Sequence, residues 1–361
     1  MSDDKKLAQL RVDIDALDNQ LIRLISTRAR LAQEVAEVKN ASLEPANFYR
    51  PEREAQILKK VIEQNKGPLC EEEMARLFRE IMSACLALEQ QLDIAYLGPE
   101  GTFTQSAALK HFGHSVKTNA FSTIDQIFRE VESGASHYGV VPVENSIEGV
   151  VNHTLDMLNH SSLTICGEVE LRIHHHLLSQ NESIDEITTV YSHQQGLAQC
   201  RAWLDTHLIK AARIAVSSNA EAARIASNKS HVAAIASSIA GELYQLNNLV
   251  SNIEDQPDNT TRFLVIGKEK CNACGQDKTS LIFSAPNKPG ALHKMLSCFA
   301  DNGISMTRIE SRPSHLEMWD YVFFVDIEGH ADDEPVKKAL LELEEHAAMV
   351  KLLGSYPKAV L

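Results

Sequence analysis

The stretch DIAYLGPEGTFTQSAALKHF, residues 93–112, passes from a short apolar strand through two glycines into a helix. A dinucleotide-binding turn has the pattern G-x-G-x-x-G at this place, because the backbone must approach a pyrophosphate closely. Here the turn contains only Gly98, Pro99, Glu100 and Gly101. Pro99 has no amide hydrogen to donate, and Glu100 would repel an anion. The stretch therefore predicts the first unit of an α/β domain whose ligand is not a dinucleotide.

The chain from Asp93 to about residue 270 alternates short β-rich runs with amphipathic helices. The expected strands are 94–98, 138–145, 163–169, 188–193, 212–218, 231–237 and 262–267. The expected helices between them are 104–112, 123–134, 194–208 and 219–228. Such alternation predicts parallel or mixed sheets covered by helices, and ligands of these folds bind beyond the carboxyl ends of the strands.

Polar side chains recur at these strand ends, which favours one shared cleft. They are Thr102, Thr104, Glu144, Asn145, Ser146, Ser192, His193, Ser217, Ser218, Asn219 and the segment NTTRF at 259–263. Each of them alone would be interpreted as a helix cap or a turn residue. The histidines at 174–176 lie in a strand-like run, whose side chains alternate between faces. We expect them to be partly exposed and not to bind a metal.

The first ninety residues are expected to be helical, since no proline or glycine occurs between Leu7 and Asn40. Apolar residues recur there every three or four positions and form one stripe. They are Leu10, Ile14, Leu17, Leu21, Leu24, Leu31, Val35 and Val38. Arg28 lies on this stripe, and Lys39 points within about 20° of the same direction. A helix of roughly 34 residues is about 50 Å long. The stripe therefore predicts a partner helix, most simply from a second copy of the chain.

Two further helices are expected at 50–65 and 71–90, and the apolar face of the latter continues through Cys85 to Glu89. Burying Arg28 and Lys39 without anionic partners would be costly. The helical region therefore predicts an anionic ligand inside the bundle.

These residues resemble the all-helical chorismate mutase domain, over about residues 5–92. The resemblance implies an interlocked dimer that rearranges the dianion chorismate to prephenate in a pericyclic reaction. Arg11, from the partner subunit, and Arg28 would hold the carboxylates, and Lys39 would donate to the ether oxygen. The implied mutase site is Arg11, Arg28, Lys39, Arg53, Glu54, Cys85 and Glu89, with Lys39 and Glu89 as the catalytic residues.

Glu89 departs from the family pattern, because many relatives have Gln at this position. A carboxylate would repel an ether oxygen that gains negative charge, so Glu89 can donate only when it is protonated. Burial raises the pKa of a carboxyl group, whereas a neighbouring Lys39 would oppose the rise. We expect mutase turnover to fall as pH rises through neutrality.

The motifs GPEGTFTQSAA, VVPVENSIEGVV and NTTRF resemble prephenate dehydratase, over about residues 93–270. The resemblance implies two α/β lobes, like those of a periplasmic binding protein, with the site between them and GPEGTF as one wall. The reaction would remove carbon dioxide and the C4 hydroxyl of prephenate to give phenylpyruvate, without a metal or organic cofactor.

Thr261 matches the residue that this family regards as catalytic, and its hydroxyl can hydrogen-bond to the leaving oxygen. Arg262 points to the other face of an extended chain, and of the two we expect Thr261 to face the ligand. The other expected substrate-binding residues are Thr102, Thr104, Glu144, Asn145, Ser146, Ser192, Asn259, Arg262 and Phe263.

Beyond the polar linker EKCNACGQDK the expected order is strand 279–285, helix 290–302, strand 305–311, strand 319–328, helix 334–347 and strand 349–356. This βαββαβ order predicts an α+β, ferredoxin-like domain. The motifs NKPGAL (287–292) and ESRP (310–313) resemble the ACT domain that binds phenylalanine at a dimer interface. Gly290 would let backbone amides at the helix start meet the carboxylate of the amino acid. The implied phenylalanine site is Gly290, Ala291, Leu292, Glu310, Ser311, Arg312 and Pro313.

The composition limits other functions. The formal charge of −14 argues against non-specific binding to nucleic acid or to an anionic membrane. No apolar run approaches the roughly 20 residues that span a bilayer, and the opening residues lack a secretory signal. The seven cysteines are mostly isolated, which indicates a cytoplasmic protein. Cys271 and Cys274 form one C-x-x-C without a second pair, so we interpret them as part of a loop.

The three modules together predict a multidomain chain. We expect an all-α chorismate mutase bundle at 1–92, a two-lobed α/β dehydratase domain at 93–270 and an ACT domain at 279–361. The predicted function is a bifunctional enzyme of phenylalanine synthesis, a dimer or larger homo-oligomer, inhibited by phenylalanine. Two alternatives are a dehydratase that uses arogenate and a non-catalytic amino-acid sensor with the same two lobes. A fused prephenate dehydrogenase would need a nicotinamide site, and the missing G-x-G-x-x-G argues against it.

Overall fold

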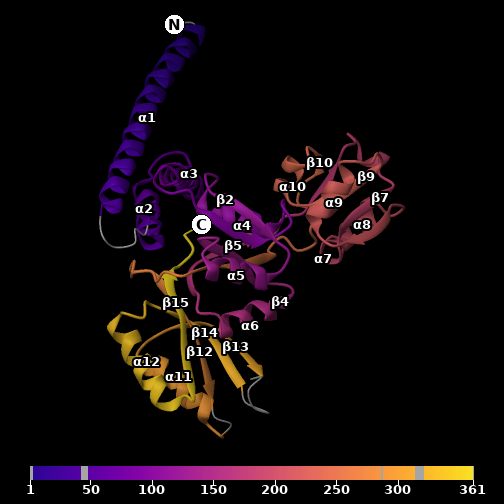
Figure 1. The fold of residues 1–361 in the computed structure, drawn as a ribbon. Helices are drawn as coiled ribbons and strands as arrows, with labels where there is room; N and C mark the ends of the chain where they lie inside the picture. The colour runs from indigo at the N-terminus through magenta and orange to yellow at the C-terminus, as the bar shows by residue number, and fades with distance from the viewer. Residues whose placement is uncertain (1–2, 42–47, 286–287, 314–320, 361) are drawn as a thin grey trace. The chain divides into compact units, whose positions relative to one another are not determined.

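The computed structural model describes residues 3–41, 48–285, 288–313 and 321–360 (Figure 1). Its residues divide into two compact units. One contains residues 1–50, 58–92 and 112–117, and the other contains residues 51–57, 93–111 and 118–361.

The first unit is built around the long helix α1 (Asp3–Asn40) and the helix α3 (Glu71–Glu89), as the apolar periodicity predicts. Pro51 begins the helix α2 (Pro51–Gln64), where a missing amide hydrogen costs nothing. Ala36 is the buried residue of α1. The apolar stripe of α1 is exposed in the single chain: Leu10, Leu17 and Leu24 are 50%, 58% and 67% accessible. The stripe therefore forms an exposed apolar surface along one helix.

The second unit begins with a mixed sheet in the order β2-β1-β3-β11-β5, with β4 added to β3. The strands are β1 (Asp93–Leu97), β2 (Lys117–Phe121), β3 (Tyr138–Asn145), β4 (Gly149–Val150), β5 (Thr164–Arg172) and β11 (Thr260–Gly267). Its helices are α4 (Phe103–Phe112), α5 (Ile124–Ser133) and α6 (Asn152–His160). Strand β3 runs parallel to β1 and antiparallel to β11. Helix α5 buries Ile127, Phe128 and Val131 completely, at the spacing of an amphipathic helix.

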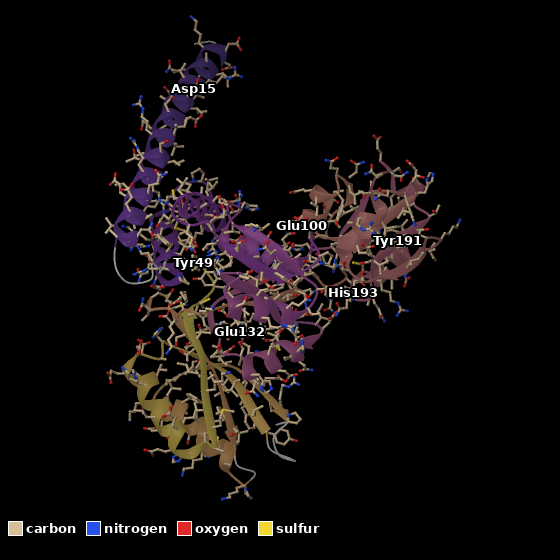
Figure 2. All side chains as sticks on the ribbon, in the orientation of Figure 1. Asp15, Tyr49, Glu100, Glu132, Tyr191 and His193 are labelled. Carbon is tan, nitrogen blue, oxygen red and sulfur yellow. The ribbon has the colours of Figure 1, made fainter. Side chains whose placement is uncertain are left out.

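A second lobe has its own sheet in the order β10-β6-β9-β7-β8. The strands are β6 (His176–Ser179), β7 (Thr189–His193), β8 (Ala212–Val216), β9 (Val232–Ala236) and β10 (Asn247–Val250). The helices are α7 (Gln194–Gln199), α8 (Arg201–His207), α9 (Asn219–Ala226) and α10 (Ser238–Leu243), with a 3-10 turn at Ile184–Glu186. His193 and Tyr191 lie in this lobe (Figure 2). The His193 ring caps α7 by accepting from the amide of Gln195. The two lobes confirm the predicted α/β fold class.

The single helix expected at 194–208 is in fact two helices. They meet at Cys200, whose φ and ψ are −113° and 19°. Asp255, far away in the sequence, accepts hydrogen bonds from the amides of Ala202 and Trp203 at 2.8 and 3.0 Å. A carboxylate that satisfies free amides at a helix start stabilises a new N-terminus there. This contact lies outside any local sequence pattern.

Two chain crossings join the lobes, one at residues 173–175 and the other at 251–259. The crossings are hydrogen-bonded to each other: the amide of Ile253 donates to the carbonyl of His175 at 2.9 Å, and the amide of Ile173 donates to that of Asn259 at 2.8 Å. The lobes therefore share a hydrogen-bonded connection rather than two independent linkers.

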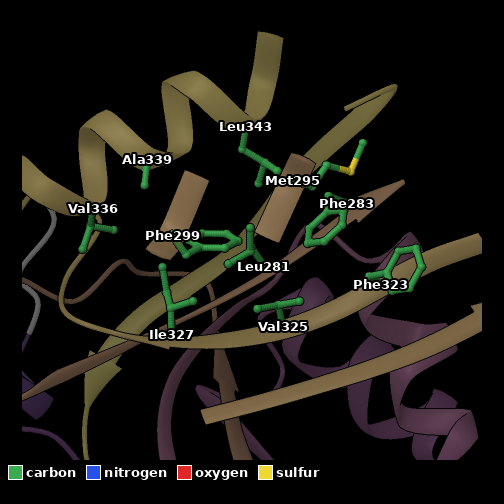
Figure 3. Close-up of a cluster of buried hydrophobic side chains, with 10 residues drawn as sticks. All are labelled: Leu281, Phe283, Met295, Phe299, Phe323, Val325, Ile327, Val336, Ala339 and Leu343. Atoms are coloured by element: carbon green, nitrogen blue, oxygen red, sulfur yellow. The ribbon is translucent and has the colours of Figure 1, made fainter. Parts of the chain in front are cut away.

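The C-terminal domain has the predicted βαββαβ order. Its elements are β12 (Asp277–Ala285), α11 (Ala291–Asp301), β13 (Met306–Pro313), β14 (Tyr321–Glu328), α12 (Glu334–His346) and β15 (Met349–Pro357). The antiparallel sheet has the order β13-β14-β12-β15. The helices cover one face of it, over a core that includes Leu281, Phe283, Phe299 and Leu343 (Figure 3).

Gly354 on β15 lies against β5, and its φ is +151°. A Cβ atom at this position would overlap the backbone oxygen of Ile165, which cannot move without displacing β5. We expect Gly354→Ala to cost about 1–3 kcal/mol of unfolding free energy, the usual cost of overpacking. Calorimetric unfolding of the purified chain measures this loss.

Gly303→Ala is the matched control for that substitution. Gly303 also has a positive φ, +68°, but no described atom lies within 4 Å of the added carbon. The Gly303→Ala variant therefore has the strain of a positive φ without a steric overlap. Equal losses for the two variants would show that the overlap with β5 has no effect.

Candidate active sites

Thr261 and Asn145 are brought together by the pairing of β11 with β3. Thr261 lies directly opposite Asn145 in this antiparallel pair, so their side chains share one face of the sheet. The Asn145 side-chain amide donates to the Thr261 hydroxyl oxygen at 2.8 Å and to the Asn259 side-chain oxygen at 2.9 Å. Asn259 is 1% exposed and lies on the second crossing between the lobes. Three residues that the sequence proposes for one site thus form one hydrogen-bonded cluster.

Gln199 joins this cluster from the second lobe, at the end of α7. Its side-chain oxygen accepts from the Asn259 amide at 3.2 Å, and its own amide donates to Glu148 at 3.2 Å. Neither Gln199 nor Glu148 was a sequence candidate. Gln199 lies inside an expected helix rather than at a strand end, and only the three-dimensional path of α7 brings it to Asn259.

The GPEGTF turn lies against the second lobe. The carbonyl of Gly101 accepts from the Ser237 hydroxyl at 2.9 Å, and a Cβ atom at Gly101 would lie 3.3 Å from Cα of Ala240. With φ of +85° and this close approach, glycine fits here better than any other residue. Thr102 is half-buried and donates to the carbonyl of Leu97, while Thr104 is buried on α4.

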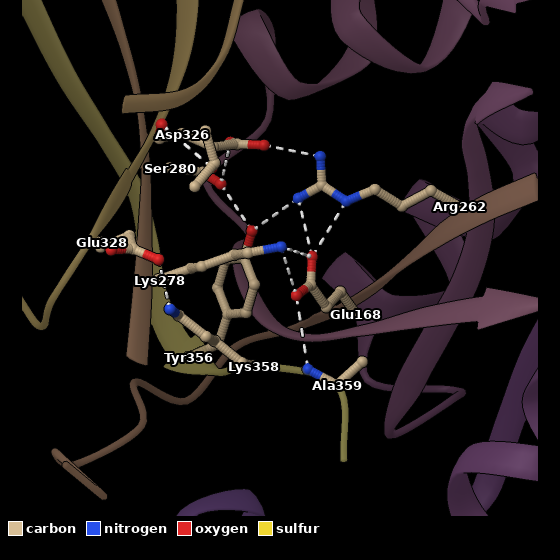
Figure 4. Close-up of polar contacts among 10 residues, drawn as sticks. Glu168, Arg262, Lys278, Ser280, Asp326, Glu328, Tyr356, Lys358 and Ala359 are labelled. Carbon is tan, nitrogen blue, oxygen red and sulfur yellow. Dashed lines mark hydrogen bonds and ion pairs between the residues drawn. The ribbon is translucent and has the colours of Figure 1, made fainter. Parts of the chain in front are cut away.

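Arg262 and Glu144 lie on the face of the same two strands opposite to Thr261 and Asn145. They face each other in the register of β11 and β3. Arg262 donates to Glu168 at 2.9 Å, to Asp326 at 2.6 Å and to the Tyr356 hydroxyl at 3.1 Å (Figure 4). Glu144 forms an ion pair with Arg308 of β13 at 3.0 Å. Both side chains are directed to the C-terminal domain and away from the Thr261 face.

Three other expected dehydratase residues have structural contacts instead. Ser192 is fully buried, and its hydroxyl oxygen lies 2.9 Å from the side-chain oxygen of Asn219 and 3.0 Å from the carbonyl oxygen of Ile235. Phe263 is 2% exposed in the core of the sheet. Ser146 is exposed, and its hydroxyl accepts from the amide of Thr260 at 3.0 Å where β3 and β11 separate.

Of the histidines at 174–176, His174 and His176 are partly exposed as expected, whereas His175 is buried. His175 is 1% exposed and belongs to the first crossing, while β6 begins only at His176. His174 pairs with Glu254 at 2.8 Å. Among the described residues, no three His, Cys, Asp or Glu side chains gather as a metal ion would need.

The first unit places Lys39 and Glu89 together. The Lys39 ammonium group lies 3.8 Å from the Glu89 carboxylate and 5.1 Å from the centroid of the Phe48 ring. Burial raises the pKa of Glu89, and the charges of Lys39 and Arg28 oppose the rise without cancelling it. Cys85 is 4% exposed one turn earlier on α3.

The other expected mutase residues are more open. Arg28 is half-buried on α1, and Arg11 is exposed far along the same helix. Arg53 is exposed and Glu54 is half-buried on the first turn of α2, which belongs to the other compact unit.

The expected phenylalanine residues flank α11 and β13. Gly290 caps α11 with φ of +80°, and a side chain there would meet no described atom within 4 Å, so the glycine is required by its conformation. Ala291 and Leu292 begin the helix and are half-buried. Arg312 pairs with Asp156 of α6 at 3.1 Å. The list is completed by Glu310, which is half-buried, and by Ser311 and Pro313, which are exposed. Asn287 of the NKPGAL motif lies outside the described residues.

The chain contains three parts in sequence order. They are a helical bundle with a paired lysine and glutamate, a two-lobed α/β domain with a polar cluster at its crossings, and an α+β domain. This combination defines a multidomain enzyme with an attached regulatory module. The family models match accordingly: chorismate mutase type II at residues 10–90, prephenate dehydratase at 94–271 and the ACT domain at 279–345. The chain belongs to the bifunctional chorismate mutase/prephenate dehydratase family.

A curated protein of that name from Stutzerimonas stutzeri is 58% identical over 365 residues, covering 100% of both chains. The solved prephenate dehydratase of Arthrobacter aurescens in complex with L-Phe is 32% identical, with a TM-score of 0.68, over 74% of this chain and 90% of that one. A structure titled as a novel type of quorum quenching acylase is 28% identical, with a TM-score of 0.69, over 74% of this chain and 98% of that one. In the described part of the chain, no helix has the length and apolar character for crossing a bilayer.

The Arg262 contacts predict a structural rather than a substrate-binding role. We expect Arg262→Gln to remove the cation paired with the buried Asp326 and to leave Glu168 with Lys278 alone, at a cost of about 3–5 kcal/mol. Thermal unfolding should show a large loss of stability. Arg201→Gln, which removes an ion pair whose side chains are 79% and 54% exposed, should leave the unfolding temperature nearly unchanged. A stable Arg262→Gln protein with a raised KM would instead indicate substrate binding.

Proposed function

We propose that the helical domain rearranges chorismate to prephenate, that the two-lobed domain converts prephenate to phenylpyruvate, and that phenylalanine bound to the ACT domain inhibits the second step. The domains would comprise residues 1–92, 93–270 and 279–361. The observation that carries the proposal is the presence of both polar sites in a chain that matches this bifunctional family over its whole length. The seven free cysteines fit a cytoplasmic enzyme.

The mutase reaction needs no covalent catalysis, so binding and electrostatics must supply the rate. Arg28 and Lys39 would bind the dianion from one subunit, and Arg11 would come from the partner of a homodimer or larger oligomer. The exposed stripe of α1 supports this arrangement, because Leu10 and Leu17 need a covering helix. Lys39 would donate to the ether oxygen as negative charge develops there.

Glu89 would act as a second donor in its protonated form. Its raised pKa keeps the carboxyl protonated at higher pH than an exposed glutamate, and Lys39 at 3.8 Å lies where both groups can meet one oxygen. Arg53, Glu54 and Cys85 would complete the mutase site.

The dehydratase reaction breaks a carbon–carbon bond and a carbon–oxygen bond. Carbon dioxide leaves, its bonding electrons move into the ring, and the C4 hydroxyl departs and takes a proton to become water. The Thr261 hydroxyl oxygen already accepts from Asn145, so its hydrogen is available for the departing oxygen. Thr261 would therefore assist the leaving group. Asn145, Asn259, Thr102 and Thr104 would shape the same site.

Regulation would pass through contacts between β13 and the dehydratase lobe. Strand β13 carries the ESRP motif, and it also holds Arg308 against Glu144 and Arg312 against Asp156. Glu144 is next in the chain to Asn145. A shift of β13 on binding phenylalanine at Gly290–Leu292 and Glu310–Pro313 would reach the Thr261 cluster through one peptide unit. Coupling of this kind is typically about 1–3 kcal/mol.

Feeding chorismate and following both products tests the function and the role of Thr261. We expect the wild-type chain to form prephenate and then phenylpyruvate, and phenylalanine to suppress the second product more than the first. Thr261→Ala should lower phenylpyruvate formation by about 100-fold, with prephenate accumulating at the normal rate.

Thr260→Ala is the matched control, because that hydroxyl donates to the carbonyl of Asp258 and not to the cluster. Normal phenylpyruvate formation by Thr261→Ala would reject the assignment. A wild-type chain that yields no phenylpyruvate from prephenate would be a non-catalytic sensor. Faster turnover of arogenate than of prephenate would identify arogenate as the substrate of the dehydratase domain.

The pKa of Glu89 predicts the pH dependence of the mutase. As pH rises through this elevated pKa the carboxyl group loses its proton, so turnover should fall. Glu89→Gln keeps an amide donor at every pH and should flatten the profile of kcat against pH. Glu80→Gln, on the same helix but paired with His114, should retain the wild-type profile. Coincident profiles for wild type and Glu89→Gln would exclude Glu89 as the donor.

A further inference from the structure

His175 is a buried residue for which the reaction scheme above has no use. It lies on the first crossing between the lobes and is 1% exposed. Its ring Nε2 lies 2.8 Å from the side-chain oxygen of Gln199. The same oxygen accepts from Asn259, which accepts from Asn145, which donates to Thr261. A series of side-chain hydrogen bonds therefore links His175, at one end, to the Thr261 hydroxyl at the other.

The backbone sets the direction of every hydrogen bond in this chain. The side-chain oxygen of Asn145 accepts from the amides of Ile147 and Glu148 at 3.0 and 3.1 Å. Its amide nitrogen must therefore be the group that donates to Asn259 and to Thr261.

The same reasoning continues outward from Asn259. Because the Asn259 oxygen accepts from Asn145, its amide donates to the Gln199 oxygen, and the Gln199 amide donates to Glu148. An oxygen faces His175, so Nε2 of the ring carries the hydrogen and donates. In this arrangement the Thr261 oxygen accepts and its hydrogen remains free for a ligand.

The surroundings of His175 hold the ring in that tautomer. Its backbone amide donates to Glu254 at 2.8 Å, and its ring packs edge-on against Phe103 at 5.5 Å between centroids. The other ring nitrogen, Nδ1, is buried and has no hydrogen-bond partner among the described residues. A proton there would be a buried donor without an acceptor, which is costly. Burial also lowers the pKa of His175, although the nearby Glu254 opposes this, and a lowered pKa likewise favours the neutral ring.

We propose that His175 is a positioning residue for the dehydratase: its Nε2 hydrogen bond holds the Gln199 side chain and thereby keeps Asn259 and Asn145 in place beside Thr261. The inference rests on the proposed function of Thr261. Without the His175 hydrogen bond the Gln199 oxygen keeps the Asn259 donor but loses its second one, so the outer end of the cluster is held less firmly and Asn145 is less well placed against Thr261. His175 does not touch the substrate in this scheme.

Two substitutions distinguish loss of the hydrogen-bond donor from loss of the imidazole ring. The amide nitrogen of Gln is as many bonds from Cα as Nε2 of His, whereas that of Asn is one bond shorter. We expect His175→Asn to lower kcat for phenylpyruvate formation about tenfold with little change in KM, since one hydrogen bond is lost. His175→Gln should remain within about threefold of wild type, because it replaces the donor.

His176→Asn is the matched control. His176 is the next residue of the same run and begins β6, and its Nδ1 has no hydrogen-bond partner among the described residues. Its kcat should stay near the wild-type value. The mutase rate and the thermal unfolding of each variant report whether the chain remains folded.

Normal kcat in folded His175→Asn would overturn the proposal, and so would equal losses in folded His175→Gln and His175→Asn or a change in KM alone. These failures are distinct from failure of the proposed function. If Thr261→Ala retains activity, the site itself is wrong; if Thr261→Ala loses activity while His175→Asn does not, only the positioning role is wrong.

Discussion

The antiparallel register of β11 on β3 is the constraint on which both the dehydratase site and its link to the ACT domain depend. Thr261 lies opposite Asn145, and Arg262 lies opposite Glu144. Because side chains alternate across a strand, one pair faces the crossings between the lobes and the other faces the ACT sheet. A slip by one residue would exchange the faces and would bury Thr261 among the ACT charges. Two adjacent residues on each strand thus connect two domains.

The buried charges behind that register form a network that is costly unless it is complete. Glu168, whose side chain is 1% exposed, accepts from Arg262 and Lys278, while Asp326 accepts from Arg262 and Ser280. Each charge has an opposite partner, and the Tyr356 hydroxyl binds both Arg262 and Ser280. Such networks contribute little net stability against an apolar core, but they tolerate few alternative alignments. We infer that their main effect is to hold β11 and the ACT sheet in one alignment.

Much of this architecture could be predicted from the sequence, because the periodicity of apolar residues and the residues that end helices and strands are local properties. Strand β3 matches the predicted run 138–145, and α3 matches to one residue. The short strands β2 and β10 were not predicted, since Lys117 and Asn247 begin runs with little apolar alternation and pairing alone defines them. The break at Cys200 was also missed, because Asp255 creates it from more than fifty residues away.

The two sites differ in how visible they are in a sequence, and the reason is electrostatic. Arg28 and Lys39 stand out because a cation on an apolar stripe is improbable without an anion to bind. The dehydratase cluster consists of neutral amides and hydroxyls, which occur equally often as caps and turns. Ser192 and Gln199 show the consequence. Ser192 lies at a strand end, as a site residue was expected to, and its hydroxyl contacts the backbone of Ile235. Gln199 lies within a helix, and it hydrogen-bonds to Asn259 of the cluster. A neutral site is defined by the direction of its hydrogen bonds, and that direction exists only once the chain has folded.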